Sequence, residues 1–154
     1  MDSRTVKAGR SIIRDQVLID GPALPWKDPA AFAELMLSWE MRSYRLAESI
    51  SGPVFFDRGV PDVIGYLRLV DLPVPPHAIR AAERLRYSGL VFIAPPWPAI
   101  FVQDSERRQT LEEAERTYRS VAAAYADYGY RLVHLPLAPI EARMRFVLDV
   151  IRAG

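Results

Sequence analysis

The chain has 154 residues, of which half are hydrophobic and a quarter are charged, and this composition is typical of a globular domain rather than a disordered or fibrous chain. We expect one domain spanning residues 1–154, because a chain of this size buries roughly two-thirds of its surface in a single core. Twenty basic and 19 acidic residues leave a net charge of +1. No overall field therefore favours nucleic acid or an acidic membrane as a partner.

Cysteine is absent from the sequence, which excludes disulfides, thiolate metal sites and a cysteine nucleophile. The first ten residues contain no apolar stretch of the kind found in a signal peptide. The most apolar run, over 90–102, is interrupted by prolines and is too short to span a bilayer. These features favour a cytoplasmic protein that is not inserted in a membrane.

The first half of the chain predicts helices around one buried strand. Apolar spacing predicts a helix over 8–19. A longer helix begins after Asp28, a favourable N-cap that proline follows, and ends near Gly52. The continuous apolar run over 53–57 predicts a strand that is covered on both faces of a sheet, and a further helix begins near Pro61. The expected core face of the long helix consists of Phe32, Leu35, Met36, Trp39, Leu46 and Ile50.

The second half of the chain predicts two more strands. A short helix over 76–85 leads into an apolar strand over 90–94, which prolines end. A capping-box signature at 110–113 opens a helix that ends near Gly129. A third strand over 130–135 precedes the final helix, and this order of elements implies an α/β domain with parallel strands. The expected core face of the final helix consists of Ile140, Met144, Val147, Leu148 and Ile151.

Asp57 and Arg58 stand at the carboxyl end of the predicted strand over 53–57, the edge at which α/β sheets bind ligands. A carboxylate at this edge holds a hydrated Mg²⁺ or accepts a proton from a substrate hydroxyl, and a guanidinium binds phosphate through two hydrogen bonds. The alternative is purely structural. In that interpretation Asp57 caps the next helix and Arg58 pairs with Asp62 at the surface.

The polar segment over 103–109 is the second candidate, because it precedes the capped helix and carries Arg107 and Arg108. Their permanent charge and forked shape suit a lid that closes over a polyphosphate. The alternative is a solvated loop in which Glu106 screens the two arginines. His77 and His134 have no neighbours at metal-ligand spacing, and we predict no zinc site.

Five segments of the sequence form a combination that points to one family. They are Ala8-Gly9-Arg10-Ser11-Ile12-Ile13-Arg14, Leu24-Pro25-Trp26, Phe56-Asp57-Arg58-Gly59 with Pro61-Asp62 and Tyr66, Val91-Phe92-Ile93-Ala94-Pro95-Pro96-Trp97, and Glu106-Arg107-Arg108. From about Val6 onward the chain resembles the P-loop, kinase-like predicted ATPases of the AAA type that are related to the ribosylnicotinamide kinase domain. The resemblance implies a three-layer P-loop NTPase-like parallel sheet with helices on both faces.

The same resemblance implies ATP and Mg²⁺ as cofactors and a small molecule as phosphate acceptor. It gives catalytic roles to Asp57 and Arg58, with Asp57 also the Mg²⁺ ligand, and it gives nucleotide binding to Arg107 and Arg108. The expected function is that of an AAA-type ATPase or an ATP-dependent small-molecule phosphotransferase. The alternative is a non-catalytic α/β module that binds a protein partner or a second copy of itself through an uncovered sheet.

One element of the family pattern is absent, since the sequence contains no G-x-x-x-x-G-K-[ST] phosphate loop. Lys7 also stands where the family pattern has a glutamate. We therefore expect an N-terminally truncated form without the P-loop strand, and an impaired activity. The loss of about four charge-assisted contacts, each worth roughly 1.5 kcal/mol, weakens nucleotide binding by about 10⁴-fold.

Overall fold

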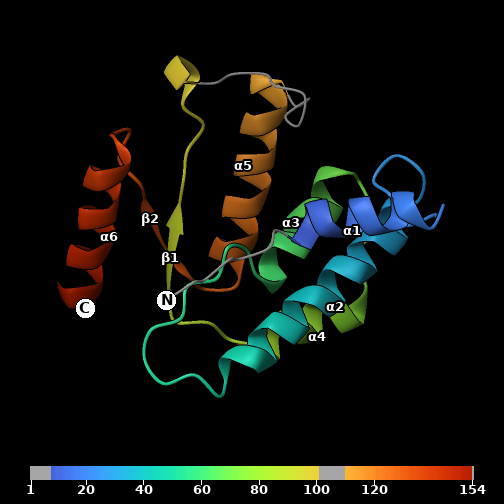
Figure 1. Cartoon of the computed structure of the whole chain (residues 1–154), viewed down its shortest axis with the longest axis horizontal. Helices are drawn as coiled ribbons and strands as arrows, with labels where there is room; N and C mark the ends of the chain where they lie inside the picture. Colours follow the sequence, from blue (N-terminus) through green and yellow to red (C-terminus); the bar gives the residue numbers. More distant parts are fainter. Residues whose placement is uncertain (1–7, 101–109, 154) are drawn as a thin grey trace. The chain divides into compact units, whose positions relative to one another are not determined.

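The computed structural model describes residues 8–100 and 110–153, which belong to two compact units, 1–86 and 87–154. The first unit consists of helices in its described part, and the second contains a small sheet with its own helices (Figure 1). The expectation of a single domain stays a prediction. Within the described ranges, every helix is either too short or too polar to cross a membrane.

The first unit contains α1 (Ala8–Leu18), α2 (Pro29–Ala47), α3 (Val60–Leu69) and α4 (Pro76–Arg84). The long helix α2 packs against both α1 and α3, and α4 packs against α3. The buried side chains at these contacts are mostly apolar, so hydrophobic burial holds the helices together. They include Ile12, Phe32, Ala33, Leu37, Val60, Val63, Ile64, Leu67, Ala78 and Ala82.

Helix α2 begins as its sequence predicts. The Asp28 carboxylate accepts a hydrogen bond from the Ala31 backbone N–H at 2.9 Å, and Pro29 occupies the first turn. The helix ends at Ala47, one turn earlier than expected. The predicted core face is wrong in part, because Leu35, Leu46 and Ile50 are exposed whereas Phe32, Ala33, Leu37 and Glu40 are buried. The face of α2 that is buried is the one against which α1 and α3 pack. The apolar spacing along α2 does not show where those two helices lie.

The predicted buried strand over 53–57 is wrong, because these residues form no strand and Phe55 is exposed. A strand needs a neighbour that satisfies its backbone N–H and C=O groups. Among the described residues, strand pairing occurs only between β1 and β2, and the segment over 53–57 takes no part in it. The segment follows Gly52, which has a φ of +96°, and leads directly into the first turn of α3. Asp57 and Arg58 therefore lie in a loop before a helix and not at a strand end.

The second unit contains a parallel pair of strands, β1 (Leu90–Ile93) and β2 (Arg131–His134), with Leu90 opposite Arg131. Helix α5 (Leu111–Asp127) connects the strands, and α5 and α6 (Ile140–Ala153) lie to either side of the pair in Figure 1. A short 3₁₀ turn over Pro98–Ile100 follows β1. The two predicted strands and their parallel direction are confirmed.

The ends of α5 follow the predicted chemistry. The Thr110 hydroxyl accepts from the Glu113 backbone N–H at 3.1 Å, and the Glu113 carboxylate accepts from the Thr110 backbone N–H at 2.7 Å. This reciprocal pair is a capping box. Gly129 follows the last turn with a φ of +78°, a conformation that glycine adopts without strain.

The predicted core face of α6 is wrong in part, because no residue of this helix is fully buried. Ile140, Met144 and Leu148 are exposed, whereas Val147 and Ile151 are half-buried. Helix α6 is apolar around more of its circumference than one packed face needs, so periodicity alone does not identify the side that packs. The tertiary structure leaves a stripe of large apolar side chains uncovered.

Candidate functional site

Arg58 and Asp62 are joined at the start of α3. The Arg58 Nη1 donates a hydrogen bond to Asp62 Oδ1 at 2.9 Å, and the Gly59 backbone N–H donates to Asp62 Oδ2 at 2.9 Å. One carboxylate therefore both caps the helix and binds the guanidinium. The Asp62 side chain is only 13% exposed and that of Arg58 is 57% exposed. The Arg58 guanidinium is therefore accessible to solvent while the carboxylate that binds it is mostly buried.

The backbone of Arg58 has a φ of +105°, which only glycine adopts readily. Such a conformation costs on the order of 1–3 kcal/mol and persists where its surroundings hold it in place. Here Asp62 holds both the Arg58 side chain and the amide of the next residue. The side chain of Asp62 therefore determines the direction of the chain immediately before α3.

Glu40 is a buried carboxylic acid on α2, with 6% of its surface exposed. The pKa of the Glu40 carboxyl is raised to about 7, first by burial and then by the negative charges of Asp62 and Asp57, against the lowering effect of the positive charge of Arg58. Near neutral pH this group is thus close to half protonated. We call Glu40, Asp57, Arg58 and Asp62 the acidic corner.

Tyr66 lies one turn beyond Asp62 on α3 and extends the polar character of the contact between α2 and α3. Its ring packs edge-to-face against Phe32, with centroids 5.4 Å apart. Its hydroxyl is buried and has no hydrogen-bond partner in the described part of the chain. Burial also raises the pKa of the Tyr66 phenol. The contact between α2 and α3 thus contains a buried hydroxyl in addition to the acidic corner.

The structure bears out one part of the structural interpretation of Asp57 and Arg58 and contradicts the other. The N-cap of α3 is Gly59, so the interpretation of Asp57 as the cap is wrong. The surface pairing of Arg58 with Asp62 is correct. Asp57 is exposed beside this pair, where its carboxylate is accessible to a ligand. The catalytic roles of Asp57 and Arg58 stay predictions, and Arg107 and Arg108 lie outside the described residues.

Glu40 is the member of the corner that sequence reasoning missed. The acidic groups at 40, 57 and 62 do not form a familiar hydrolytic motif, and their proximity arises only because α2 packs on α3. One signal in the sequence does identify it, since Glu40 follows Ala33 and Leu37 at helical spacing and shares their buried face. A glutamate on the apolar face of a helix indicates an acid whose pKa is shifted by burial.

The carboxylate of Asp57 is a suitable ligand for Mg²⁺, an ion that binds few protein groups. In the ranges 8–100 and 110–153, no three histidine, cysteine or acidic side chains are arranged to hold a metal ion. Mg²⁺ does not need such a cage, because it retains several waters and binds through one or two carboxylates together with substrate phosphates. The exposed carboxylate of Asp57 meets that requirement.

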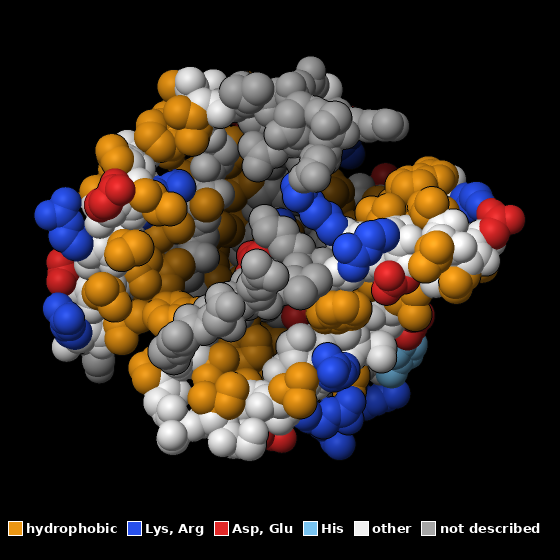
Figure 2. Space-filling model, viewed as in Figure 1, with side chains coloured by type: hydrophobic (Ala, Val, Ile, Leu, Met, Phe, Trp, Pro, Cys, Tyr) orange, Lys and Arg blue, Asp and Glu red, His pale blue; other side chains and the backbone are white. Residues whose placement is uncertain are grey.

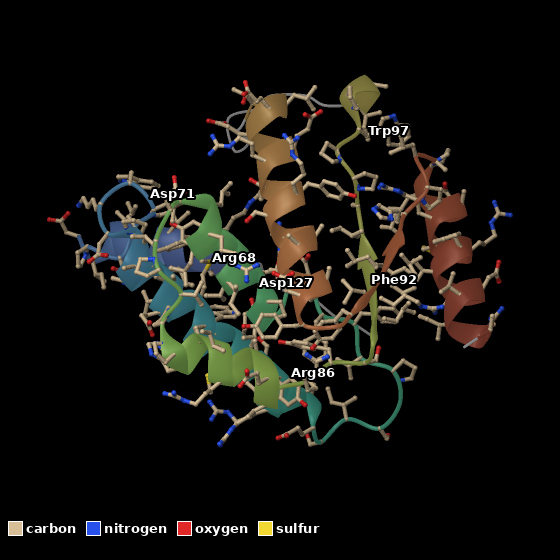
Figure 3. All side chains as sticks on the ribbon, turned by 180° about the vertical axis from the view of Figure 1, so that it is seen from behind. Arg68, Asp71, Arg86, Phe92, Trp97 and Asp127 are labelled. Atoms are coloured by element: carbon tan, nitrogen blue, oxygen red, sulfur yellow. The ribbon has the colours of Figure 1, made fainter. Side chains whose placement is uncertain are left out.

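Polar side chains also gather at the carboxyl end of the strand pair in the second unit. Trp97 lies beyond the end of β1, which contains Phe92 (Figure 3). The Arg143 guanidinium lies 5.9 Å from the centre of the Trp97 ring, and its Nε donates to the Pro136 carbonyl at 3.0 Å. His134, the last residue of β2, lies 2.6 Å from the Tyr118 hydroxyl.

Parallel strands joined by a helix, with polar groups at their carboxyl end, define an α/β protein of the kind that binds ligands at that edge. The chain matches the AAA domain family over residues 6–143, which is most of its length, and it belongs to that family. Membership confirms the resemblance at the level of a P-loop NTPase-like, nucleotide-binding class. No curated protein and no solved structure matches the chain.

Proposed function

We propose that this chain binds ATP with Mg²⁺ and supports phosphoryl transfer to a small acceptor, or hydrolysis, at the acidic corner. Membership of the AAA domain family is the observation that carries the proposal. The corner supplies the residue types that such a reaction uses, an exposed carboxylate beside a guanidinium. In this proposal the protein's part is to position the nucleotide and to balance charge.

Asp57 is proposed to hold Mg²⁺ or to orient the acceptor hydroxyl, and Arg58 to contact a phosphate. The Arg58 guanidinium is more than half exposed and is oriented by Asp62, so a phosphate can approach it without breaking the helix cap. Arg107 and Arg108 are proposed to neutralise the charge that develops during transfer. Bound Mg²⁺ offsets the negative charge of the phosphates.

We propose weak nucleotide binding for this chain by itself, because the 154 residues contain no glycine-rich phosphate loop. A micromolar affinity reduced by about 10⁴-fold becomes a dissociation constant of roughly 10 mM. The kinase relationship, the three-layer sheet and the absence of its first strand belong to the same proposal. The parallel β1–β2 pair and the helical connection through α5 support the parallel sheet of that fold.

Thermal unfolding with and without 10 mM Mg-ATP tests the proposal. Binding at a dissociation constant near 10 mM raises the melting temperature by about 1–2 °C. We expect Asp57→Asn to remove this shift, because the corner loses its exposed carboxylate. The matched control is Asp71→Asn, an exposed aspartate at the other end of α3 whose φ of +56° asparagine tolerates. A melting temperature that Mg-ATP leaves unchanged, or an equal loss in both variants, contradicts the proposal.

A further inference from the structure

We propose that the exposed stripe of α6 is a contact surface for a second copy of this chain. The stripe consists of Ile140, Met144 and Leu148, which are 70%, 59% and 42% exposed. Their spacing of four residues forms one ridge along the helix. Figure 2 shows hydrophobic side chains gathered on the side of the molecule where α6 lies in Figure 1.

Charged residues border this stripe in a specific order. At about 100° per residue, Glu141 and Arg152 lie along one border of the stripe, near its two ends. Arg145 lies about 20° beyond Arg152 on the same side of the helix, and Asp149 lies about 60° beyond Arg152. Neither Glu141 nor Arg152 forms an ion pair within the described ranges of the chain. The border therefore carries one negative end and one positive end.

This order of charges complements itself when two copies of α6 run antiparallel. With Met144 opposite Leu148 of the second copy, Ile140 meets the half-buried Ile151 at the next level. The same register brings Glu141 opposite Arg152 of the second copy, and the two-fold axis repeats every contact. In a parallel pairing the two-fold axis would place this border of one helix against the opposite border of the other, so Glu141 and Arg152 would not meet. The pattern thus fits a second copy in one orientation.

The predicted dimer is weak, because the stripe is only one helix wide. A standard stable interface buries about 800 Å² on each partner, more than three or four side chains supply. We expect a dissociation constant on the order of 100 µM. The inference does not depend on nucleotide binding, since none of these side chains belongs to the acidic corner.

Sedimentation velocity of the full chain between about 10 µM and 1 mM tests whether the dimer forms. We expect the weight-average mass to rise with concentration for the unmodified chain, and to remain that of a monomer for Leu148→Glu. The matched control is Leu18→Glu, which alters a more exposed leucine, 82% exposed, in the first unit and should dimerise like the parent. A parent chain that is monomeric at 1 mM overturns the proposal, as does an equal effect of both substitutions.

A charge exchange tests the orientation. Glu141→Arg and Arg152→Glu each oppose like charges across the axis, and we expect each to weaken dimerisation by about tenfold. The double variant restores two opposite-charge pairs and should dimerise like the parent. Circular dichroism of each variant checks that α6 remains helical. Single variants without effect, or a double variant weaker than either single one, overturn the antiparallel pairing.

Discussion

The guanidinium of Arg58 and the carboxylate of Asp62 meet at 2.9 Å across the first turn of α3. The second oxygen of the same carboxylate accepts from the Gly59 backbone N–H, so the ion pair and the helix cap share one side chain. This arrangement holds Arg58 at a φ of +105° and joins the loop after α2 to the start of α3. The stability of the first unit and the geometry of the acidic corner therefore depend on the same two residues.

Asp62→Asn should destabilise the first unit by about 1–2 kcal/mol, because it removes the ion pair and weakens the helix cap. Urea unfolding followed by circular dichroism measures the change. Asp71→Asn is the control, since Asp71 is exposed at the carboxyl end of α3, where a negative charge opposes the helix dipole. A loss of stability in the Asp71 variant as large as that in the Asp62 variant would contradict this account.

Arg58→Gly should unfold at a higher temperature than Arg58→Ala. Both variants lose the same side-chain contacts, but only glycine adopts a φ of +105° without strain. We expect a difference in the free energy of unfolding of about 1 kcal/mol in favour of glycine. Equal stabilities, or a more stable alanine variant, would show that the backbone at this position relaxes.

Glu40→Gln should alter the pH dependence of stability. Below pH 4.5 the carboxyl of Glu40 is protonated in the folded and the unfolded chain, and its titration has no effect. Between pH 4.5 and about 7 the unfolded chain has released the proton while the folded chain retains it, so the free energy of unfolding falls as pH rises. The loss reaches roughly 3 kcal/mol above pH 7. We expect Glu40→Gln to remove this slope and to be more stable than the parent at pH 8.

The control for this titration is Glu48→Gln, at the exposed carboxyl end of α2. This variant leaves the carboxyl of Glu40 unchanged, so the fall in stability that Glu40 causes between pH 4.5 and about 7 should persist in it. Urea unfolding at each pH provides the measurement for both variants. A pH slope that persists in Glu40→Gln assigns the titration to another group.

Thr110→Ala should destabilise the second unit by about 1 kcal/mol, because it opens the capping box of α5. Hydrogen exchange of the α5 amides localises the effect to the first turns of the helix. Glu112→Gln is the control, because Glu112 lies in the same turn, is exposed and takes no part in the box. A change in exchange that spreads over the first unit instead would contradict a local cap.

Helix ends and turns follow directly from the sequence in this protein. The start of α2 is set by Asp28 and Pro29, and the start of α5 by the capping box at 110–113, because these residues satisfy backbone N–H groups of the first turn. The end of α5 is set by Gly129, which adopts a positive φ without strain. The strands at 90–93 and 131–134 are also predictable, because their apolar runs find each other as parallel neighbours. The apolar run over 53–57 predicts a strand equally well but forms none, because no other strand pairs with it in the described structure.

The sequence by itself determined the α/β class, most element boundaries and the proximity of Arg58 to Asp62, because these depend on local hydrogen bonding and short-range spacing. Only the tertiary structure decided that Glu40 joins them as a buried acid and that Ile140, Met144 and Leu148 are left in solvent. Burial is a property of what packs against a helix. The periodicity of a single helix marks which of its faces are apolar, but the neighbouring elements determine which of those faces is covered.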